Sequence, residues 1–178
     1  MGRDKALLPH GEQSQLAHLM QILHALLPKV FVSARAEQQD EAERSRFPQI
    51  IDRYRDLGPV AGILSAMDEH PAADWLVVAC DLPNLDAATI SYLVERRSPD
   101  KPFTAYLSSH DGLPEPLCAV YRADSAAIVR AFVADGLHCP RKMLIRSETE
   151  LLQQPDPGSL DNINTPDDLR GSRLGGAA

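Results

Sequence analysis

The most constraining feature of this sequence is the apolar run at residues 75–80, Trp-Leu-Val-Val-Ala-Cys, which ends at Asp81. When this run is extended, both of its faces are apolar. A strand of that kind is typical of a parallel sheet that is covered on both sides. The run therefore predicts the central strand of an α/β sheet with helices packed on each face.

Segments with strand-like and helix-like patterns alternate along the rest of the chain. Short apolar runs predict strands at residues 30–32, 50–51, 103–107 and 117–121. Apolar residues at helical spacing, together with cap and proline signals, predict helices at residues 13–27, 60–69, 87–97, 125–135, from 140 and from 165. Residues 34–46 are polar and predict a solvated helix or loop. This alternation indicates an α/β sandwich with a mostly parallel sheet.

The length of 178 residues suits one domain, which we expect at residues 1–170, followed by a disordered Gly- and Ala-rich tail at 171–178. The formal net charge is −7 and there is no basic run, which argues against sequence-independent nucleic-acid binding. No apolar stretch approaches the roughly 20 residues that span a bilayer, and no signal peptide pattern opens the chain, so we expect no membrane partner. Three widely spaced cysteines without a C-x-x-C pair predict free thiols in a reducing cytoplasm.

Two carboxylates directly follow predicted strands. Asp52 follows residues 50–51, and Asp81 follows the run at 75–80. Ligands of open α/β sheets bind at the carboxyl ends of the strands, which places both side chains where chemistry is expected. Asp81 has two interpretations of equal weight. It is either a ligand for Mg²⁺, which commonly takes one or two carboxylates and substrate phosphates, or a cap of the next turn.

Two glycine-containing segments have a binding interpretation and a plain structural one. Lys5, in the run Gly-Arg-Asp-Lys at residues 2–5, is either the end of a phosphate cradle or a solvated lysine near a terminus. The segment Gly58–Gly62 is either a turn that presents backbone N–H groups to an anion or base edge, or simply the start of a helix. Taken on its own, each segment favours the plain structural interpretation.

Five motifs taken in order resemble one enzyme family, the molybdenum cofactor guanylyltransferases or MobA-like nucleotidyltransferases. Residues 1–8 are similar to the second half of its opening signature, L-A-G-G-x-S-x-R-M-G-x-D-K. The other similarities are Asp52 with residues 58–63 to D…G-P-L-A-G-I, residues 79–83 to C-D-x-P, residues 116–121 to P-L-x-A-x-Y, and residues 161–169 to N-I-N-T-P-E-D-L. These motifs extend over nearly the whole chain.

The resemblance implies a Rossmann-like nucleotidyltransferase three-layer sandwich. The implied reaction transfers GMP from GTP to the terminal phosphate of molybdopterin and releases pyrophosphate. Lys5 and Asp81 would be the catalytic residues, with Lys5 on the nucleotide phosphates and Asp81 on Mg²⁺. The implied nucleotide site also contains Ser33, Asp52, Gly58 and Gly62. Asn162 and Asn164 are implied on the metal and acceptor side. Arg141 and Lys142 stand in place of a basic segment near the acceptor, where they either contact the pterin phosphate or form a basic, solvated helix start.

The sequence departs from the family in two places. Ser33 stands where guanylyltransferases often have an Asn that contacts the nucleotide, so recognition of the base or ribose is expected to differ. The first half of the opening signature, a buried strand and a Gly-Gly phosphate loop, does not precede Met1. We expect that strand, missing from this sequence, between the strand ending at Ser33 and the one ending at Asp81. The chain is then a fragment or its start was assigned at an internal Met.

Alternative functions remain open at this point. A related nucleotidyltransferase would use CTP, or would act on a sugar phosphate or another phosphorylated acceptor. A domain without catalysis would bind nucleotide or molybdopterin and act through a partner; transient contact with other molybdenum cofactor proteins is possible in either case. Residues Lys5, Asp52 and Asp81 favour an enzyme, and nothing in the sequence distinguishes guanine from cytosine.

Overall fold

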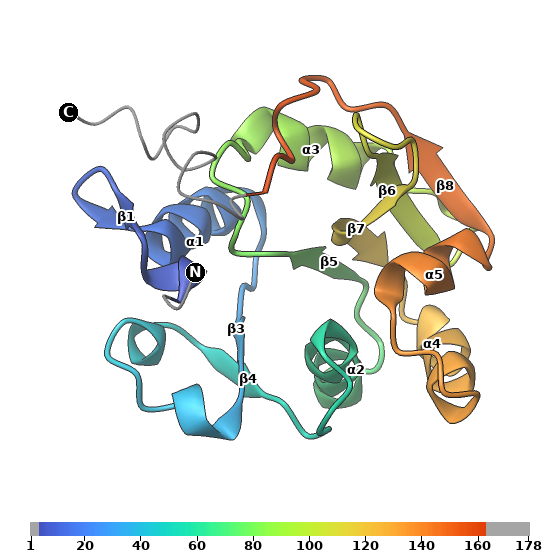
Figure 1. The fold of residues 1–178 in the computed structure, drawn as a ribbon, viewed down its shortest axis with the longest axis horizontal. Coiled ribbons are helices and arrows are strands. Elements are labelled where there is room, and N and C mark those ends of the chain that lie inside the picture. Colours follow the sequence, from blue (N-terminus) through green and yellow to red (C-terminus); the bar gives the residue numbers. More distant parts are fainter. Residues whose placement is uncertain (1–3, 163–178) are drawn as a thin grey trace.

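A computed structural model of the chain describes residues 4–162 (Figure 1). The helices are α1 (Gln15–Leu26), α2 (Pro59–Glu69), α3 (Ala87–Glu95), α4 (Ser125–Ala134) and α5 (Pro140–Ile145). The strands are β1 (Pro9–His10), β2 (Gln13–Ser14), β3 (Val32–Ala34), β4 (Gln49–Ile51), β5 (Trp75–Val78), β6 (Phe103–Leu107), β7 (Pro114–Tyr121) and β8 (Thr149–Leu152). Among these residues, no helix combines the length and apolarity needed to cross a membrane.

Helices cover both faces of the strands, which confirms the predicted three-layer arrangement. On one face, α1 and α3 pack through a core that includes Leu19, Leu23, Ile90 and Leu93. On the other face, α2, α4 and α5 pack through a second core that includes Val60, Leu64, Val129 and Met143. Figure 1 shows the two groups above and below the strands.

The main sheet is mixed rather than mostly parallel. Its strand order is β5-β7-β6-β8, with β7 antiparallel to both neighbours and β8 parallel to β6. The physical reason lies in the connection between β6 and β7, which is only residues 108–113. A parallel pair needs a crossover of a dozen or more residues, whereas a short turn forces an antiparallel hairpin. Gly112, at φ 68°, supplies the left-handed residue of that turn.

Strands β3 and β4 form a separate parallel pair. Within residues 4–162, β3 is hydrogen-bonded to β4 but not to β5, and β5 is hydrogen-bonded to β7 alone. Side chains connect the two sheets near the start of these strands, where the rings of Phe31 and Trp75 lie 5.9 Å apart. Strands β3 and β5 are thus both sheet edges in this part of the chain. The sequence predicts a further strand between them.

Several boundaries differ from the sequence prediction. The strand predicted at 30–32 lies at Val32–Ala34. Its pairing with the β4 segment begins at Val32, whose N–H donates to Pro48 O at 2.8 Å. Residues 34–46 form two single 3₁₀ turns, Ala36–Gln38 and Arg44–Arg46. Strand β8 was not predicted because Thr149–Leu152 is half-polar and pairs only at a sheet edge. The helix predicted from 165 and the tail at 171–178 lie outside the described residues.

Candidate active site

Lys5 and Asp81 meet in the structure, although 76 positions separate them. Lys5 Nζ lies 3.0 Å from Asp81 Oδ2, and both side chains are about one-third exposed, at 31% and 27%. Asp81 lies two residues beyond the last hydrogen bond between β5 and β7, in which Ala79 N–H donates to Leu117 O at 2.8 Å. A cation and a carboxylate are therefore held together at the carboxyl end of β5, which the sequence predicted to be a central strand and which is a sheet edge within residues 4–162.

Arg44 positions the segment that carries Lys5. The side chain of Asp4 caps the 3₁₀ turn Lys5–Leu7 by accepting from Ala6 N–H at 3.1 Å, and its second oxygen accepts from Arg44 Nη2 at 2.7 Å. Arg44 is buried, with 7% of its side chain exposed, and also pairs with Glu41. Sequence reasoning missed this residue because it lies in the polar segment 34–46, which has no periodic pattern to mark one buried arginine.

Ser33, Asp52 and Gly62 form a second group. Asp52 N–H donates to Ala34 O at 2.9 Å, which continues the β3–β4 pairing, and Ser33 Oγ donates to Asp52 Oδ1 at 2.9 Å. A Cβ built on Gly62 would lie 2.3 Å from Ser33 Oγ and 3.3 Å from Asp52 Oδ1. The missing side chain of Gly62 is therefore what allows α2 to approach this hydroxyl–carboxylate pair.

We expect Gly62→Ala to weaken nucleotide binding without lowering the melting temperature. The new methyl group would force the Ser33 hydroxyl to rotate away from Asp52, while alanine in α2 favours the helix by about 1 kcal/mol. Loss of one hydrogen bond that orders the site corresponds to a roughly 2- to 10-fold rise in the Kd for nucleotide. Calorimetry and thermal melts measure the two quantities. A double variant with Ser33→Ala should bind no worse than Ser33→Ala alone, and additive losses would contradict this account.

Burial raises the pKa of Asp52 above its usual value, although the Ser33 hydroxyl and Arg35 oppose the shift. Because the folded state then holds the proton more tightly than the unfolded chain, this carboxyl group stabilises the fold at acid pH and loses that contribution as pH rises through the raised pKa. We expect Asp52→Asn to melt at a higher temperature than the wild type at pH 7, with the difference shrinking toward pH 4. Melts across this pH range test it, and a constant difference would contradict the titration of Asp52.

Gly58 sets the entry to α2. Its backbone has φ 56° and ψ −138°, a region that side chains disfavour, and Pro59 occupies the first helical position. A Cβ on Gly58 would meet no described atom within 4 Å, so glycine is required here by backbone conformation and not by space. The turn predicted at 58–62 is thus present, and the first N–H groups of α2 lie one turn from Gly62.

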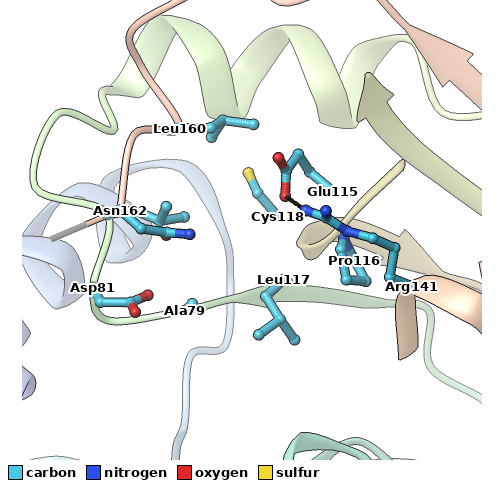
Figure 2. Close-up of a pocket in the computed structure, with 10 residues that line it drawn as sticks. Ala79, Asp81, Glu115, Pro116, Leu117, Cys118, Arg141, Leu160 and Asn162 are labelled. Carbon is cyan, nitrogen blue, oxygen red and sulfur yellow. Dashed lines mark hydrogen bonds and ion pairs between the residues drawn. The ribbon is translucent and has the colours of Figure 1, made fainter. Parts of the chain in front are cut away.

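A pocket of about 150 Å³ adjoins Asp81 (Figure 2). Its wall contains Ala79 and Asp81 from the end of β5, residues 115–118 from β7, Arg141 from α5, and Asn162. The predicted residues Asp81, Arg141 and Asn162 therefore share one pocket. Ser33, Asp52, Gly58 and Gly62 do not line it, which separates the described site into two parts. Asn164 lies outside the described residues.

The two basic residues predicted to contact an acceptor differ in their surroundings. Arg141 Nη1 donates to Asp111 Oδ2 at 3.0 Å and Nη2 donates to Glu115 Oε2 at 2.8 Å. Lys142 is exposed on α5 and is not part of the pocket wall. Sequence reasoning missed Glu115 because it looked for polar residues after strands, whereas an antiparallel strand such as β7 begins at the edge where its neighbours end.

The donor set at Asp81 fits a phosphate-bound divalent cation. Residues 4–162 contain no group of three or more His, Cys, Asp or Glu able to hold a metal by themselves. Mg²⁺ seldom needs such a cage, since one or two carboxylates, substrate phosphates and water commonly complete its shell. Asp81 is an accessible carboxylate, and the Asn162 side chain in the same pocket adds an amide oxygen.

Cys80 and Cys118 carry no sign of nucleophilic use, and Cys139 is exposed rather than packed in the interior as predicted. All three are free thiols. Burial, reinforced by the neighbouring Asp81 charge, raises the pKa of Cys80, and burial raises the pKa of Cys118 to about 12. A thiol with a raised pKa is seldom ionised at neutral pH and is a poor nucleophile. Cys80 is therefore a packing residue beside Asp81, as predicted.

The family model of the MobA-like NTP transferase domain matches residues 1–151, which include Lys5, Asp81, the Ser33–Asp52–Gly62 group and every described helix. The chain belongs to the MobA-like NTP transferase family. Membership establishes the chain as a nucleotidyltransferase, which confirms the enzyme class predicted from the five motifs. Nucleotidyltransferases of this family generally use a divalent metal ion.

Two relatives show how the chain aligns within this family. A probable molybdenum cofactor guanylyltransferase from Mycobacterium ulcerans is 33% identical over 174 residues, which cover 95% of this chain and 85% of the relative. A molybdenum cofactor biosynthesis bifunctional protein from a Synechocystis species is 32% identical over 168 residues. That alignment covers 94% of this chain but only 48% of the bifunctional protein, so the chain spans about half of its length.

Solved structures share the fold at lower identity. The molybdopterin-guanine dinucleotide biosynthesis protein A from Archaeoglobus fulgidus has a TM-score of 0.75 and 23% identity, covering 96% of this chain and 89% of its own. The 2-C-methyl-D-erythritol 4-phosphate cytidylyltransferase from Thermus thermophilus has a TM-score of 0.73 and 11% identity, covering 95% and 92%. These similarities confirm a Rossmann-like nucleotidyltransferase fold and, at such identities, nothing finer.

Proposed function

We propose that this chain transfers GMP from GTP to the terminal phosphate of molybdopterin and releases pyrophosphate. The observation that carries the proposal is the Lys5–Asp81 pair at 3.0 Å beside a pocket that is separate from the Ser33–Asp52–Gly62 group. A transferase needs this division, because the nucleotide and the acceptor must bind side by side and meet at one charged point. The name of the Mycobacterium ulcerans relative, a probable molybdenum cofactor guanylyltransferase, supports guanylyl transfer, and that of the Synechocystis relative supports a role in molybdenum cofactor biosynthesis.

The predicted residues other than Arg141 and Lys142 have the following roles in this scheme. The Ser33–Asp52 pair and the backbone at Gly58 and Gly62 bind the guanosine part of GTP, while Lys5 binds its phosphates. Asp81 holds Mg²⁺, with Asn162 and Asn164 on the acceptor side. When bound, Mg²⁺ supplies positive charge that offsets the repulsion between the attacking phosphate and the triphosphate. Lys5 adds a second cation at the same point, so no covalent nucleophile is required.

A nucleotide screen tests the proposal. Calorimetry with GTP, CTP and ATP in the presence of Mg²⁺, followed by pyrophosphate release on addition of molybdopterin, separates the alternatives. We expect GTP to bind most tightly and to be consumed only with molybdopterin. Preference for CTP would indicate the cytidylyl branch. Binding without pyrophosphate release, in this chain and in an N-terminally extended one, would indicate a binding domain without catalysis.

We expect Lys5→Ala to weaken GTP binding or slow transfer by about 10- to 150-fold. A hydrogen bond from an ammonium group to a phosphate contributes roughly 1.5–3 kcal/mol, and alanine removes it together with the partner of Asp81. Rates at saturating and limiting GTP measure the effect, with Lys29→Ala as the exposed control. Unchanged affinity and rate would remove Lys5 from the site.

The cell compartment and the partners follow from this function. GTP and molybdopterin are the proposed substrates, and the cytoplasm is the proposed compartment, which the free thiols support. Passing the product directly to a molybdenum enzyme would avoid its exposure to water. We therefore infer transient contacts with other molybdenum cofactor proteins, which cross-linking in the presence of product would detect.

A further inference from the structure

We propose that Glu115 recognises the pterin ring of the acceptor and that Arg141 is the positioning residue that holds Glu115 in place. The inference rests on the proposed function, because it assigns a determinant of acceptor specificity within that site. The recognised chemistry is the aminopyrimidinone edge of a pterin, where a ring N–H and an exocyclic amino group lie side by side. Two adjacent donors of this kind match the two oxygens of one carboxylate.

The topology explains how Glu115 reaches the pocket. Val78 of β5 pairs with Cys118 of β7, and Ala79 N–H closes the last rung on Leu117 O. Beyond this hydrogen bond, the chain that follows β5 turns away from the sheet toward Asp81. Strand β7 runs in the opposite direction, so its first residues, from Pro114, continue past the end of β5. Residues 115–117 therefore form one wall of the pocket, and the turn from Ala79 to Asp81 forms another. Figure 2 shows Asp81 and Asn162 on one side of the pocket and Glu115 with Arg141 on the other.

The charges favour a ligand that donates hydrogen bonds at the Glu115 end. One guanidinium, that of Arg141, contacts two carboxylates, Asp111 and Glu115, so the cluster retains a negative excess. A phosphate at Arg141 would first have to displace a carboxylate, which makes this end unsuitable for the acceptor phosphate. Glu115 uses Oε2 for Arg141, and a carboxylate has about four acceptor positions in all. It can therefore accept from a ligand without releasing Arg141.

The size of the pocket and its two ends set the orientation of the acceptor. Whole-ligand pockets measure about 300–1,000 Å³, so about 150 Å³ suits one ring system of a larger molecule. With the ring at Glu115, the phosphate of the same acceptor extends toward Asp81 and Lys5, where transfer takes place. The proposed nucleotide-binding residues Ser33, Asp52 and Gly62 lie outside this pocket. Recognition of guanine is therefore separate from recognition of the pterin.

The first experiment compares two probes that differ in a single group. 6-Hydroxymethylpterin has the 2-amino group, and 6-hydroxymethyllumazine has an oxygen in its place. We expect wild-type protein to bind the pterin at least about 10-fold more tightly, as a hydrogen bond to a charged group implies. Glu115→Gln should reduce the ratio to within about threefold, and Glu115→Asp, which shortens the side chain, should reduce it as well. Glu148→Gln, an exposed control with the same charge change, should keep the wild-type ratio.

The second experiment measures transfer. Glu115→Gln should raise the KM for molybdopterin about 10-fold or more, with the KM for GTP and the preference for GTP over ITP unchanged. A wild type that does not discriminate between the two probes, or an unchanged KM for molybdopterin in Glu115→Gln, overturns the inference. A changed GTP-to-ITP preference does so too, since Glu115 would then contact guanine. If the wild type does not act on molybdopterin, the proposed function fails, and the probe ratio still decides whether Glu115 recognises a pterin edge.

Discussion

Replacing Asp81 with Asn is expected to reduce nucleotidyl transfer by about 10³-fold or more while the protein remains folded. Loss of one electrostatic contact to a transition state typically costs 10²–10³ in rate, and Asp81 is both the proposed metal ligand and the partner of Lys5. The amide keeps the shape of the side chain but removes its charge, so Mg²⁺ and Lys5 lose their common anchor. GTP-dependent pyrophosphate release measures the loss.

The fold should tolerate this change because the Asp81 side chain is 27% exposed and its ion pair with Lys5 is also solvated. Surface ion pairs of this kind contribute at most about 1 kcal/mol to stability. Asp100→Asn is the matched control, since Asp100 is exposed and does not line the pocket. Turnover close to that of the wild type in Asp81→Asn would show that Asp81 does not hold the metal.

A chain extended at its N-terminus by about 12–15 residues, one strand and a Gly-Gly turn, is expected to be markedly more stable and more active than residues 1–178. The predicted place for the strand is between β3 and β5, which are not hydrogen-bonded to each other in the described part of the chain. The turn would bring backbone N–H groups to the phosphates ahead of Lys5. Backbone groups at a helix or loop start are effective phosphate ligands.

The expected gain is large because an inserted strand is paired on both sides. Each added hydrogen bond contributes about 0.5–1.5 kcal/mol, and each buried aliphatic side chain about 1.5–3 kcal/mol. A total of even 5 kcal/mol would raise the melting temperature by about 10–20 °C in a domain of this size. The half-buried side chains of β5, Trp75 to Val78, are those that would become covered.

Thermal melts and pyrophosphate release compare the two chains directly. Trp75 is the single tryptophan, and its ring lies 5.9 Å from Phe31 across the two sheet edges. Its fluorescence should therefore shift to shorter wavelength when the strand is added. An extension of equal length with a scrambled sequence is the control. Equal stability and activity in the extended and unextended chains would mean that the site of residues 1–178 works without the loop.

The sequence by itself determined the strands and helices whose patterns are set by local burial. The apolar run at residues 75–80 correctly predicted a strand, although β5 is a half-buried sheet edge and not a central strand within residues 4–162. The helix from Ala87 begins where Asp86 accepts from Thr89 N–H at 2.9 Å. The apolar runs also correctly predicted that Asp52 and Asp81 follow strands. These features could be predicted because they depend on residues close together in the chain.

Only the tertiary structure decided which side chains meet. Lys5 reaches Asp81, Arg44 reaches Asp4 over 40 positions, and Arg141 joins Asp111 to Glu115 from another element. The direction of β7 places Glu115 in the pocket, and the approach of α2 to Ser33 makes Gly62 indispensable for spacing. No local pattern encodes such contacts, because strand direction and helix approach are settled by the packing of the whole core. An ion pair between distant segments forms only after that packing has brought them together.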